Sequence, residues 1–343
     1  MPKIAVVLFN LGGPDRPASV RPFLFNLFND PAIIGAPAPA RFLLAKFIAW
    51  RRGPKAEAIY AELGGGSPLL ANTEAQARGV EAKLAPLGQV RVFIAMRYWH
   101  PMSAATARDV AAFAPDELVL LPLYPQFSTA TTASSRLDWD RAARDADIAI
   151  PPRAVCCYPS NGGFVRALAD LIRPAYARAG QHGRPRLLFS AHGLPKRLVE
   201  RGDPYQWQIE RTAGAVVAAL AVPDLDWTVC YQSRVGPLEW IGPSTKHEIE
   251  RAGRERVAVV VVPIAFVSEH SETLVELDIE YRRWARAAGV PHYERVPAVA
   301  THPAFIAGLA DLTRAALARP PGLCSGEGGR LCPASRTGCA MAG

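Results

Sequence analysis

The sequence lacks the features that mark several common classes of protein. No window contains the ~18 consecutive apolar residues that a membrane-spanning helix requires. Met1, Pro2 and Lys3 lead directly into the apolar segment 4–9, so no signal peptide is recognisable and we expect a cytoplasmic protein. The net charge of +8 comes from arginines that are spread along the chain rather than gathered in one run, so nucleic acid is not an expected partner.

Two glycine-rich segments also lack the spacing of nucleotide-binding motifs. Residues 64–69 do not end in the Gly-Lys-Ser/Thr of a phosphate-binding loop. Residues 12–14 lack the G-x-G-x-x-G pattern of a dinucleotide site. The sequence therefore gives no support to NAD or ATP as a ligand.

What the chain does contain is an alternation of β-branched runs and amphipathic segments. Candidate strands cover residues 4–9, 90–96, 118–123, 186–190, 227–231 and 257–266, with helical patterns between them, the last over residues 271–288. This order predicts parallel sheets with helices on both faces. A length of 343 residues fits two halves. Pro151 and Pro152 suggest a boundary that gives halves over residues 1–150 and 151–318, with a tail over 319–343.

Residues with chemical character follow these predicted strands. His192 lies at the end of one strand, between Ala191 and Gly193, and Glu269 and His270 follow another. Ligands of open α/β sheets bind at the carboxyl ends of the strands, so we expect an active site in a cleft between two such sheets. A histidine at that position suits a general base or a metal ligand, although a lone histidine is more often structural.

Three glutamates stand at intervals of four residues after the last predicted strand. Glu272, Glu276 and Glu280 would lie one above another on the face of an α-helix. The ladder is either a solvated face or a file of carboxylates that binds hydrated cations or relays protons.

Residues 22–55 combine many apolar side chains with a basic cluster at residues 51–55. They form either a pair of core helices or an apolar lip that admits a hydrophobic substrate and contacts the anionic surface of the inner membrane.

Taken together, these segments resemble the ferrochelatases, the enzymes that insert Fe²⁺ into protoporphyrin IX at the end of haem synthesis. The matching segments are residues 10–14, 51–55, 64–68, 97–101, 123–128, 190–195, 231–243 and 266–281. The resemblance implies an α/β fold of two similar Rossmann-like halves, each a doubly wound parallel sheet, with a porphyrin cleft between them. It also implies a lyase and leaves the possibility of a homodimer open.

The resemblance further implies roles for particular residues. His192 and Glu272 match the opposed catalytic pair, with His192 as the proton acceptor, and the residues that would line the porphyrin are Leu11, Ser67, Arg97, Tyr98 and Trp240. The expected metal-binding set is His192, Glu272, Glu269, His270 and Glu276. Two positions depart from the common pattern: Glu269 replaces an aspartate, and Arg234 replaces a lysine.

The tail after residue 318 contains Cys324, Cys332 and Cys339 in a glycine-rich context. Some ferrochelatases hold a [2Fe–2S] cluster with three tail cysteines and one from the body of the protein, which here would be Cys157 or Cys156. Neighbours in a strand point to opposite faces, so we expect only one of these two to be a ligand. A zinc site or free thiols are the alternatives.

Other functions compete with metal insertion. A non-catalytic haem or porphyrin carrier could use the same cleft, and the tail alone could suggest an electron carrier. Among chelatases, coproporphyrin is an alternative substrate, although the apolar character of residues 22–55 favours the less polar protoporphyrin.

Overall fold

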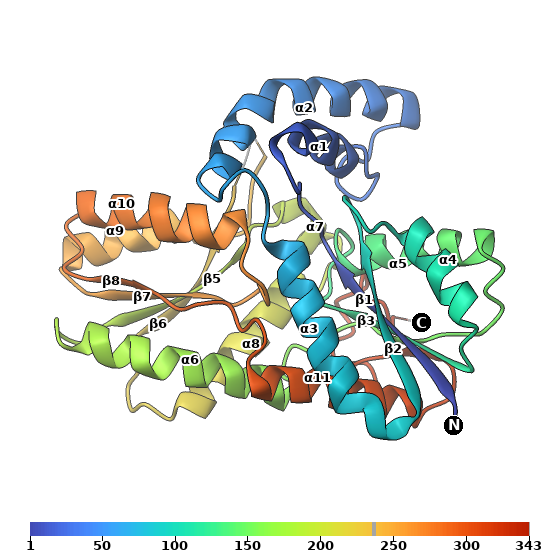
Figure 1. The fold of residues 1–343 in the computed structure, drawn as a ribbon. Helices are drawn as coiled ribbons and strands as arrows, with labels where there is room; N and C mark the ends of the chain where they lie inside the picture. Colours follow the sequence, from blue (N-terminus) through green and yellow to red (C-terminus); the bar gives the residue numbers. More distant parts are fainter. Residues whose placement is uncertain (235–237, 343) are drawn as a thin grey trace. The chain divides into compact units, whose positions relative to one another are not determined.

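The β-branched runs of the sequence form two separate parallel sheets in the computed structural model of the protein (Figure 1). The structure describes residues 1–234 and 238–342. The chain divides into two units, and neither is a continuous stretch of sequence. Unit 1 comprises Met1–Cys157 and Leu309–Gly329, and unit 2 comprises Tyr158–Gly308 and Arg330–Gly343.

The sheet of unit 1 has five parallel strands in the order β2-β1-β3-β4-β9. The strands are β1 (Lys3–Asn10), β2 (Gln89–Met96), β3 (Glu117–Pro122), β4 (Arg153–Val155) and β9 (Gly322–Cys324). Seven of the eight residues of β1 are buried, as expected for a central parallel strand that is covered on both faces.

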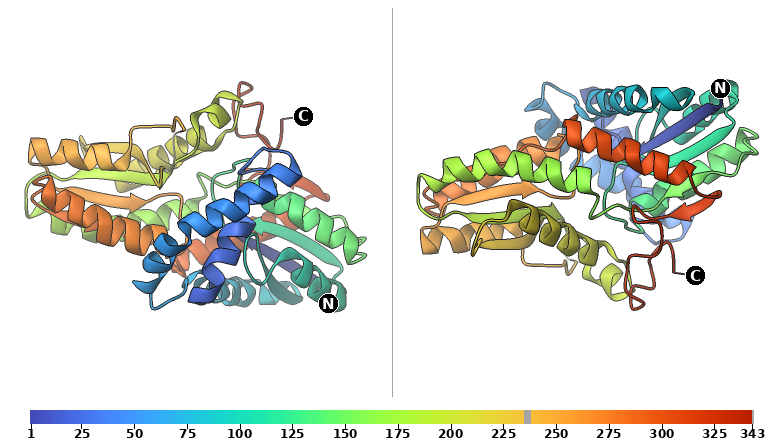
Figure 2. Two further views of the ribbon diagram at one scale, coloured as in Figure 1. Left: turned by 90° about the horizontal axis from the view of Figure 1, so that it is seen from above. Right: turned by 90° about the horizontal axis from the view of Figure 1, so that it is seen from below.

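The helices of unit 1 cover this sheet and extend beyond it. They are α1 (Val20–Phe28), α2 (Ala38–Ala61), α3 (Leu69–Leu84), α4 (Ser103–Phe113) and α5 (Thr132–Asp145), with short 3-10 turns at Pro17–Ser19 and Ala85–Leu87. α4 and α5 pack on one face of the sheet, where Trp139 and Val110 join Val7 in the core. α1 and α2 pack against each other around Phe23 and Ala49 (Figure 1, Figure 2).

The sheet of unit 2 has four parallel strands in the order β6-β5-β7-β8. The strands are β5 (Arg186–His192), β6 (Trp227–Gln232), β7 (Val259–Pro263) and β8 (Tyr293–Arg295). The predicted strand over 257–266 is shorter than expected because it ends at Pro263, which has no N–H to continue a ladder.

Helices lie on both faces of the second sheet as well. They are α6 (Gly162–Gly180), α7 (Lys196–Glu200), α8 (Tyr205–Leu220), α9 (Thr245–Glu255), α10 (Arg282–Ala287) and α11 (Pro303–Leu317), which continues into unit 1. α9 and α10 lie on one face, and α6 and α8 lie on the other (Figure 1). α6 and α11 meet at Gly163 and Gly308, where no room remains for a side chain (Figure 2).

A π-helix, η3 (Glu272–Tyr281), precedes α10 and occupies most of the segment that the sequence predicts as an α-helix. Its hydrogen bonds span one residue more than those of an α-helix, and such segments are frequent at functional sites. Leu277 and Tyr281 on η3 pack into the core of unit 2.

The α/β fold with two parallel sheets agrees with the sequence, but the division of the chain differs from the one expected at residue 150. β4 follows Pro151 and Pro152 and pairs with β3, so unit 1 continues to Cys157. The expected tail over 319–343 is also divided. Residues 319–329 join unit 1 because β9 pairs with β4, and residues 330–343 join unit 2.

In each sheet the strand order reverses beside the first strand of the unit. β1 lies between β2 and β3, and β5 lies between β6 and β7. Ligands of doubly wound sheets bind at the carboxyl ends of such strands. His192 is the last residue of β5, so the topology of unit 2 places it at this position. Within the described residues, no helix has the length and apolar character needed to cross a membrane.

Candidate active site

His192 and Glu272 are in direct contact in unit 2. His192 ends β5, and Glu272 is the first residue of η3, which follows β7 through the loop over residues 264–271. The His192 Nδ1 and Glu272 Oε2 atoms are 2.9 Å apart. Because 41% of the His192 side chain and 28% of the Glu272 side chain are exposed, the pair is accessible to a ligand.

The two side chains stabilise each other's charged forms. Burial alone would lower the pKa of His192, but the charge and hydrogen bond of Glu272, with a further contribution from Glu276, raise it above its usual value. Burial alone would raise the pKa of Glu272, but the charge and hydrogen bond of His192 outweigh this and lower it to about 2. Glu272 is therefore ionised at neutral pH and orients the imidazole through Nδ1.

His270 lies near this pair. Its Nε2 atom is 4.0 Å from Glu272 Oε2, and its ring packs against Phe266. Burial lowers the pKa of His270 more than the neighbouring carboxylates raise it, so the imidazole is neutral. The buried Nδ1 atom of His270 has no hydrogen-bond partner among the described residues.

Glu269 forms an ion pair with Arg295, which lies on a different element. Its Oε1 atom accepts hydrogen bonds from Arg295 Nη1 at 2.7 Å and from the Ala298 amide at 2.9 Å. Arg295 also pairs with Asp278 on η3. Glu269, expected to bind metal, is thus neutralised by Arg295 on β8.

Glu276 accepts four hydrogen bonds. Its Oε1 atom accepts from the Ser233 amide at 2.8 Å and the Tyr281 hydroxyl at 2.9 Å. Its Oε2 atom accepts from the Ser233 hydroxyl at 2.5 Å and from Gln232 Nε2 at 3.1 Å. Four donors occupy about all the lone pairs that a carboxylate offers. Burial and the charge of Glu272 raise the pKa of Glu276 despite these donors.

The residues expected to line a porphyrin lie partly in unit 1. Leu11 and Ser67 are half-buried, and the Ser67 amide donates to the Pro14 carbonyl. Tyr98 is fully buried, so its ring has no exposed surface in this structure. Arg97 retains 14% exposure of its side chain.

Asp30, which the sequence did not single out, joins Arg97 and Tyr98. Its Oδ2 atom accepts from Arg97 Nη2 at 2.9 Å, from the Tyr98 hydroxyl at 2.7 Å and from the Ser134 hydroxyl. Burial and the charge of Asp30 raise the pKa of Tyr98. A polar residue in an apolar segment, between α1 and α2, was the only sequence signal for this role.

Trp240 belongs to unit 2 and is half-buried. It pairs with Pro195, three residues after His192, and its ring lies against Gly193. The indole Nε1 atom is buried without a hydrogen-bond partner among the described residues. Residues 235–237, within the segment that resembles the family between Tyr231 and Trp240, lie outside the described residues.

All six cysteines are buried, and none forms a disulfide. The Sγ atoms of Cys156 and Cys157 are 3.4 Å apart. The expectation that these neighbours point to opposite faces was wrong, because β4 ends at Val155 and the strand alternation no longer applies. Cys324 lies beside them, with its carbonyl bound to the Cys156 amide, whereas Cys332 and Cys339 belong to unit 2.

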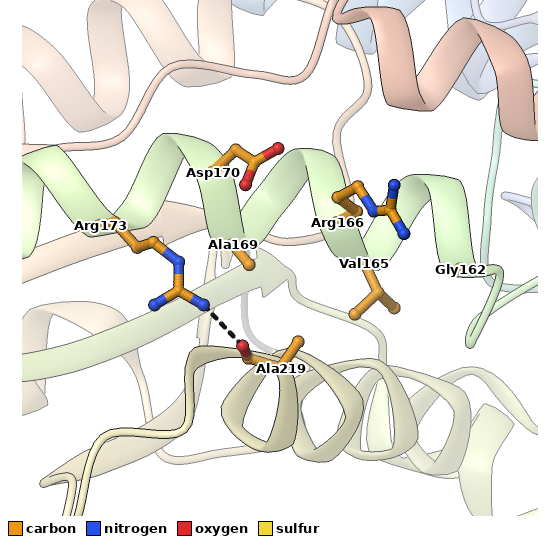
Figure 3. Close-up of a pocket in the computed structure, with 7 residues that line it drawn as sticks. All are labelled: Gly162, Val165, Arg166, Ala169, Asp170, Arg173 and Ala219. Carbon is orange, nitrogen blue, oxygen red and sulfur yellow. Dashed lines mark hydrogen bonds between the residues drawn. The ribbon is translucent and has the colours of Figure 1, made fainter.

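In the part of the chain that the structure describes, no three His, Cys, Asp or Glu side chains form a group that could hold a metal ion. A hollow of about 400 Å³ lies between α6 and α8 (Figure 3). Its lining includes Arg166, Asp170 and Arg173, and Arg173 is bound to the Ala219 carbonyl. None of the expected site residues lines this hollow.

Comparison with known proteins identifies relatives over nearly the whole chain. The family model described as ferrochelatase matches residues 3–317. A ferrochelatase of Caulobacter vibrioides is 56% identical over 340 residues, which are 98% of this chain and 97% of the relative. A ferrochelatase of Phenylobacterium zucineum is 56% identical over 341 residues, and these cover 98% of each chain. One of Hyphomonas neptunium is 50% identical over an alignment of 345 positions, which covers 99% of this chain and 95% of the relative.

Solved structures show the same fold at low sequence identity. The sirohydrochlorin chelatase SirB of Bacillus subtilis subspecies spizizenii, in complex with cobalt, has a TM-score of 0.55 and 11% identity, covering 93% of this chain and 97% of that one. SirB of Bacillus subtilis with Fe³⁺ has a TM-score of 0.52 and 12% identity, covering 92% and 96%. At this identity the likeness concerns the fold.

The contact between His192 and Glu272 predicts a shift in the titration of His192. Replacing Glu272 by glutamine keeps the shape but removes the charge that stabilises the imidazolium, so the pKa of His192 should fall. NMR titration of ¹⁵N-histidine-labelled protein measures this value directly. The variant Glu276→Gln should lower it less, because Glu276 contributes less than Glu272. An unchanged pKa in Glu272→Gln would mean that the two side chains are not in contact in solution.

Proposed function

This chain belongs to the ferrochelatase family, and we infer from that membership that it is a lyase that inserts Fe²⁺ into protoporphyrin IX in haem biosynthesis. The observation that carries the proposed mechanism is the contact of His192 Nδ1 with Glu272 Oε2 at 2.9 Å. We propose that this pair is the reaction centre.

Metal insertion makes two demands on an enzyme. Two pyrrole N–H protons must leave for each Fe²⁺ that enters, and the lone pairs of a planar ring point poorly towards a metal outside its plane. A protein that holds the ring in a bent shape stabilises a geometry nearer to the transition state. A base with a pKa near neutral must collect the protons.

His192 is the base in this proposal. Glu272 is ionised and accepts a hydrogen bond from Nδ1–H, which leaves the lone pair of the neutral ring on Nε2. Nε2 then takes a proton from a pyrrole nitrogen, and Glu272 stabilises the imidazolium that forms. The first proton must pass to solvent before the same atom accepts the second.

The residues expected to bind metal differ in the contacts that they already make. Of the expected metal-binding residues, we propose that Glu272 and the neutral His270, with Oε2 and Nε2 4.0 Å apart, contact the incoming Fe²⁺ while His192 accepts the pyrrole protons. Glu269 would have to give up Arg295, and Glu276 would have to give up four donors, before either could bind metal. Both are therefore proposed to shape the loop and η3 around Glu272.

The resemblance supports Leu11, Ser67, Arg97 and Trp240 as residues that contact the porphyrin. Trp240 offers an aromatic ring, and its buried indole N–H has no hydrogen-bond partner among the described residues. Tyr98 is buried, so we propose that it acts through Asp30, which holds the Arg97 guanidinium.

We also propose that Cys324, Cys332 and Cys339, with Cys157 or Cys156, bind a [2Fe–2S] cluster. The support is that these cysteines are buried and form no disulfide, and that the segment over 330–342 is anchored in unit 2. Gln208 Nε2 donates to Cys332 Sγ, and the Gly338 amide donates to the Gly202 carbonyl. Four cysteine ligands satisfy such a cluster.

The apolar lip is proposed as a peripheral membrane contact on the inner membrane. Five large apolar side chains of α2 are 41% to 67% exposed, namely Phe42, Leu43, Leu44, Phe47 and Trp50. Lys46, Arg51 and Lys55 on the same helix supply positive charge for anionic headgroups. An exposed apolar surface of this kind favours protoporphyrin over a more polar porphyrin.

The variant His192→Ala tests the reaction centre. Its rate of Fe²⁺ insertion should fall by at least about 100-fold because the proton acceptor is gone. This rate is measured from the loss of free-porphyrin fluorescence. Porphyrin binding should persist, and His247→Ala, which alters an exposed histidine, should behave like the unaltered protein. Turnover retained in His192→Ala would remove this residue from the mechanism. Porphyrin binding without turnover in the unaltered protein would instead indicate a carrier.

The cluster predicts charge-transfer bands in the visible spectrum of protein purified without oxygen, together with equal amounts of iron and acid-labile sulfide. Cys332→Ser should lose the bands, whereas Cys230→Ser, in the core of β6, should keep them. Their absence from the unaltered protein would overturn the cluster and leave zinc, measurable by metal analysis, or free thiols.

The lip predicts binding to vesicles that contain phosphatidylglycerol. Exchanging both Phe47 and Trp50 for serine removes buried apolar area at the membrane and should weaken binding roughly tenfold or more. Leu137→Ser, at a similarly exposed leucine on α5, is the matched control. Equal sedimentation of both variants with vesicles would exclude the lip as the contact.

A further inference from the structure

Gln232 is placed between the two residues of the proposed reaction centre. It is the last residue of β6 and pairs in register with His192 at the end of β5. Its carbonyl accepts a hydrogen bond from the amide of Gly193 at 2.8 Å. A Cβ at Gly193 would lie 2.8 Å from that carbonyl oxygen, so the close approach of the two strands requires glycine there.

The side chain of Gln232 reaches the other residue of the pair. Its Nε2 atom donates to the main-chain carbonyl of Glu272 at 3.0 Å and to Glu276 Oε2 at 3.1 Å. Gln232 is fully buried. Its backbone therefore contacts Gly193, the residue after His192, and its side chain contacts the start of η3.

Two hydroxyl groups fix the orientation of the Gln232 amide. Ser190 Oγ donates to Gln232 Oε1 at 2.8 Å, and Ser190 is itself 2.8 Å from Thr245 Oγ1. Since Ser190 uses its proton on Gln232, Thr245 is the donor of the second bond. A flipped amide would turn its oxygen towards two acceptors, so the network allows one orientation.

We propose that Gln232 is a positioning residue for metal insertion, which sets the distance and angle between His192 and Glu272. This role rests on the proposed function of that pair. Glu272 is the first residue of a π-helix, and the amides of a helix's first turn have no acceptor within the helix, so contacts from outside the helix help to fix its start. The bond from Gln232 holds this residue against β6, the neighbour of β5. A displacement of about 1 Å in a reacting group can cost ~100-fold in rate.

Two variants of Gln232 test the proposal. Gln232→Met keeps the length and apolar stem but removes both donors, and Gln232→Glu places a carboxylate against the Glu272 carbonyl and Glu276. The control is Gln76→Met, at an equally buried glutamine on α3 of unit 1. Four quantities are measured for each protein: the midpoint of thermal unfolding, porphyrin affinity by fluorescence, kcat for Fe²⁺, and the His192 Nδ1 ¹⁵N chemical shift at fixed pH.

The expected result is specific to the reaction centre. In Gln232→Met, kcat should fall about 10- to 100-fold while porphyrin affinity changes less than about twofold. The His192 Nδ1 shift should move towards its value in Glu272→Gln, and Gln232→Glu should show a larger loss of kcat. Gln76→Met should change the unfolding midpoint alone.

Other outcomes overturn the proposal. A His192 shift that is unchanged in a folded Gln232→Met protein refutes positioning, whatever the activity. Equal losses of kcat and porphyrin affinity in Gln232→Met and Gln76→Met reduce Gln232 to a general structural role. His192→Ala could also retain turnover while the His192 shift still responds to Gln232→Met. That result would show that His192 and Glu272 are not the reaction centre, although Gln232 does position them.

Discussion

The contact between His192 and Glu272 depends on where two parallel strands end. β5 and β7 are neighbours, so their carboxyl ends lie at the same edge of the sheet, with His192 on one and the loop to Glu272 following the other. The buried valines of β7 fix this edge in the core. Burial would discourage either charge alone, and the pair is stable because each side chain offsets that cost for the other.

Much of this arrangement could be predicted from sequence. Long buried strands such as β1 and β5 are recognisable in the sequence as apolar runs, and His192 is the last residue of β5. Strands of three residues, β4, β8 and β9, have too few positions to show a periodicity. Their omission had consequences, because β4 keeps the chain in unit 1 beyond Pro152 and β8 carries the partner of Glu269.

The contacts of the acidic residues could not be predicted from the sequence pattern, for a different reason. The spacing of Glu272, Glu276 and Glu280 suits an α-helix, but η3 is a π-helix, a form with no strong local signal. The partners of Glu276 include Gln232 and Ser233, more than forty residues earlier in the chain. Whether a carboxylate is free, paired with arginine or saturated with donors depends on such distant contacts. Spacing alone made the three look equivalent.

Each unit is built from two separate stretches of the chain, and this affects how the protein folds during synthesis. Unit 1 needs residues 309–329, because β9 completes its sheet, and unit 2 needs residues 330–342, which dock on Gly202 and Gln208. On the ribosome, neither unit can reach its full set of contacts until nearly the whole chain has emerged. Domains commonly fold one after another from the N-terminus during translation. Here the two units keep an open sheet edge or an uncovered face until their last segments have been synthesised. For the same reason, no single cut in the chain would release either unit intact.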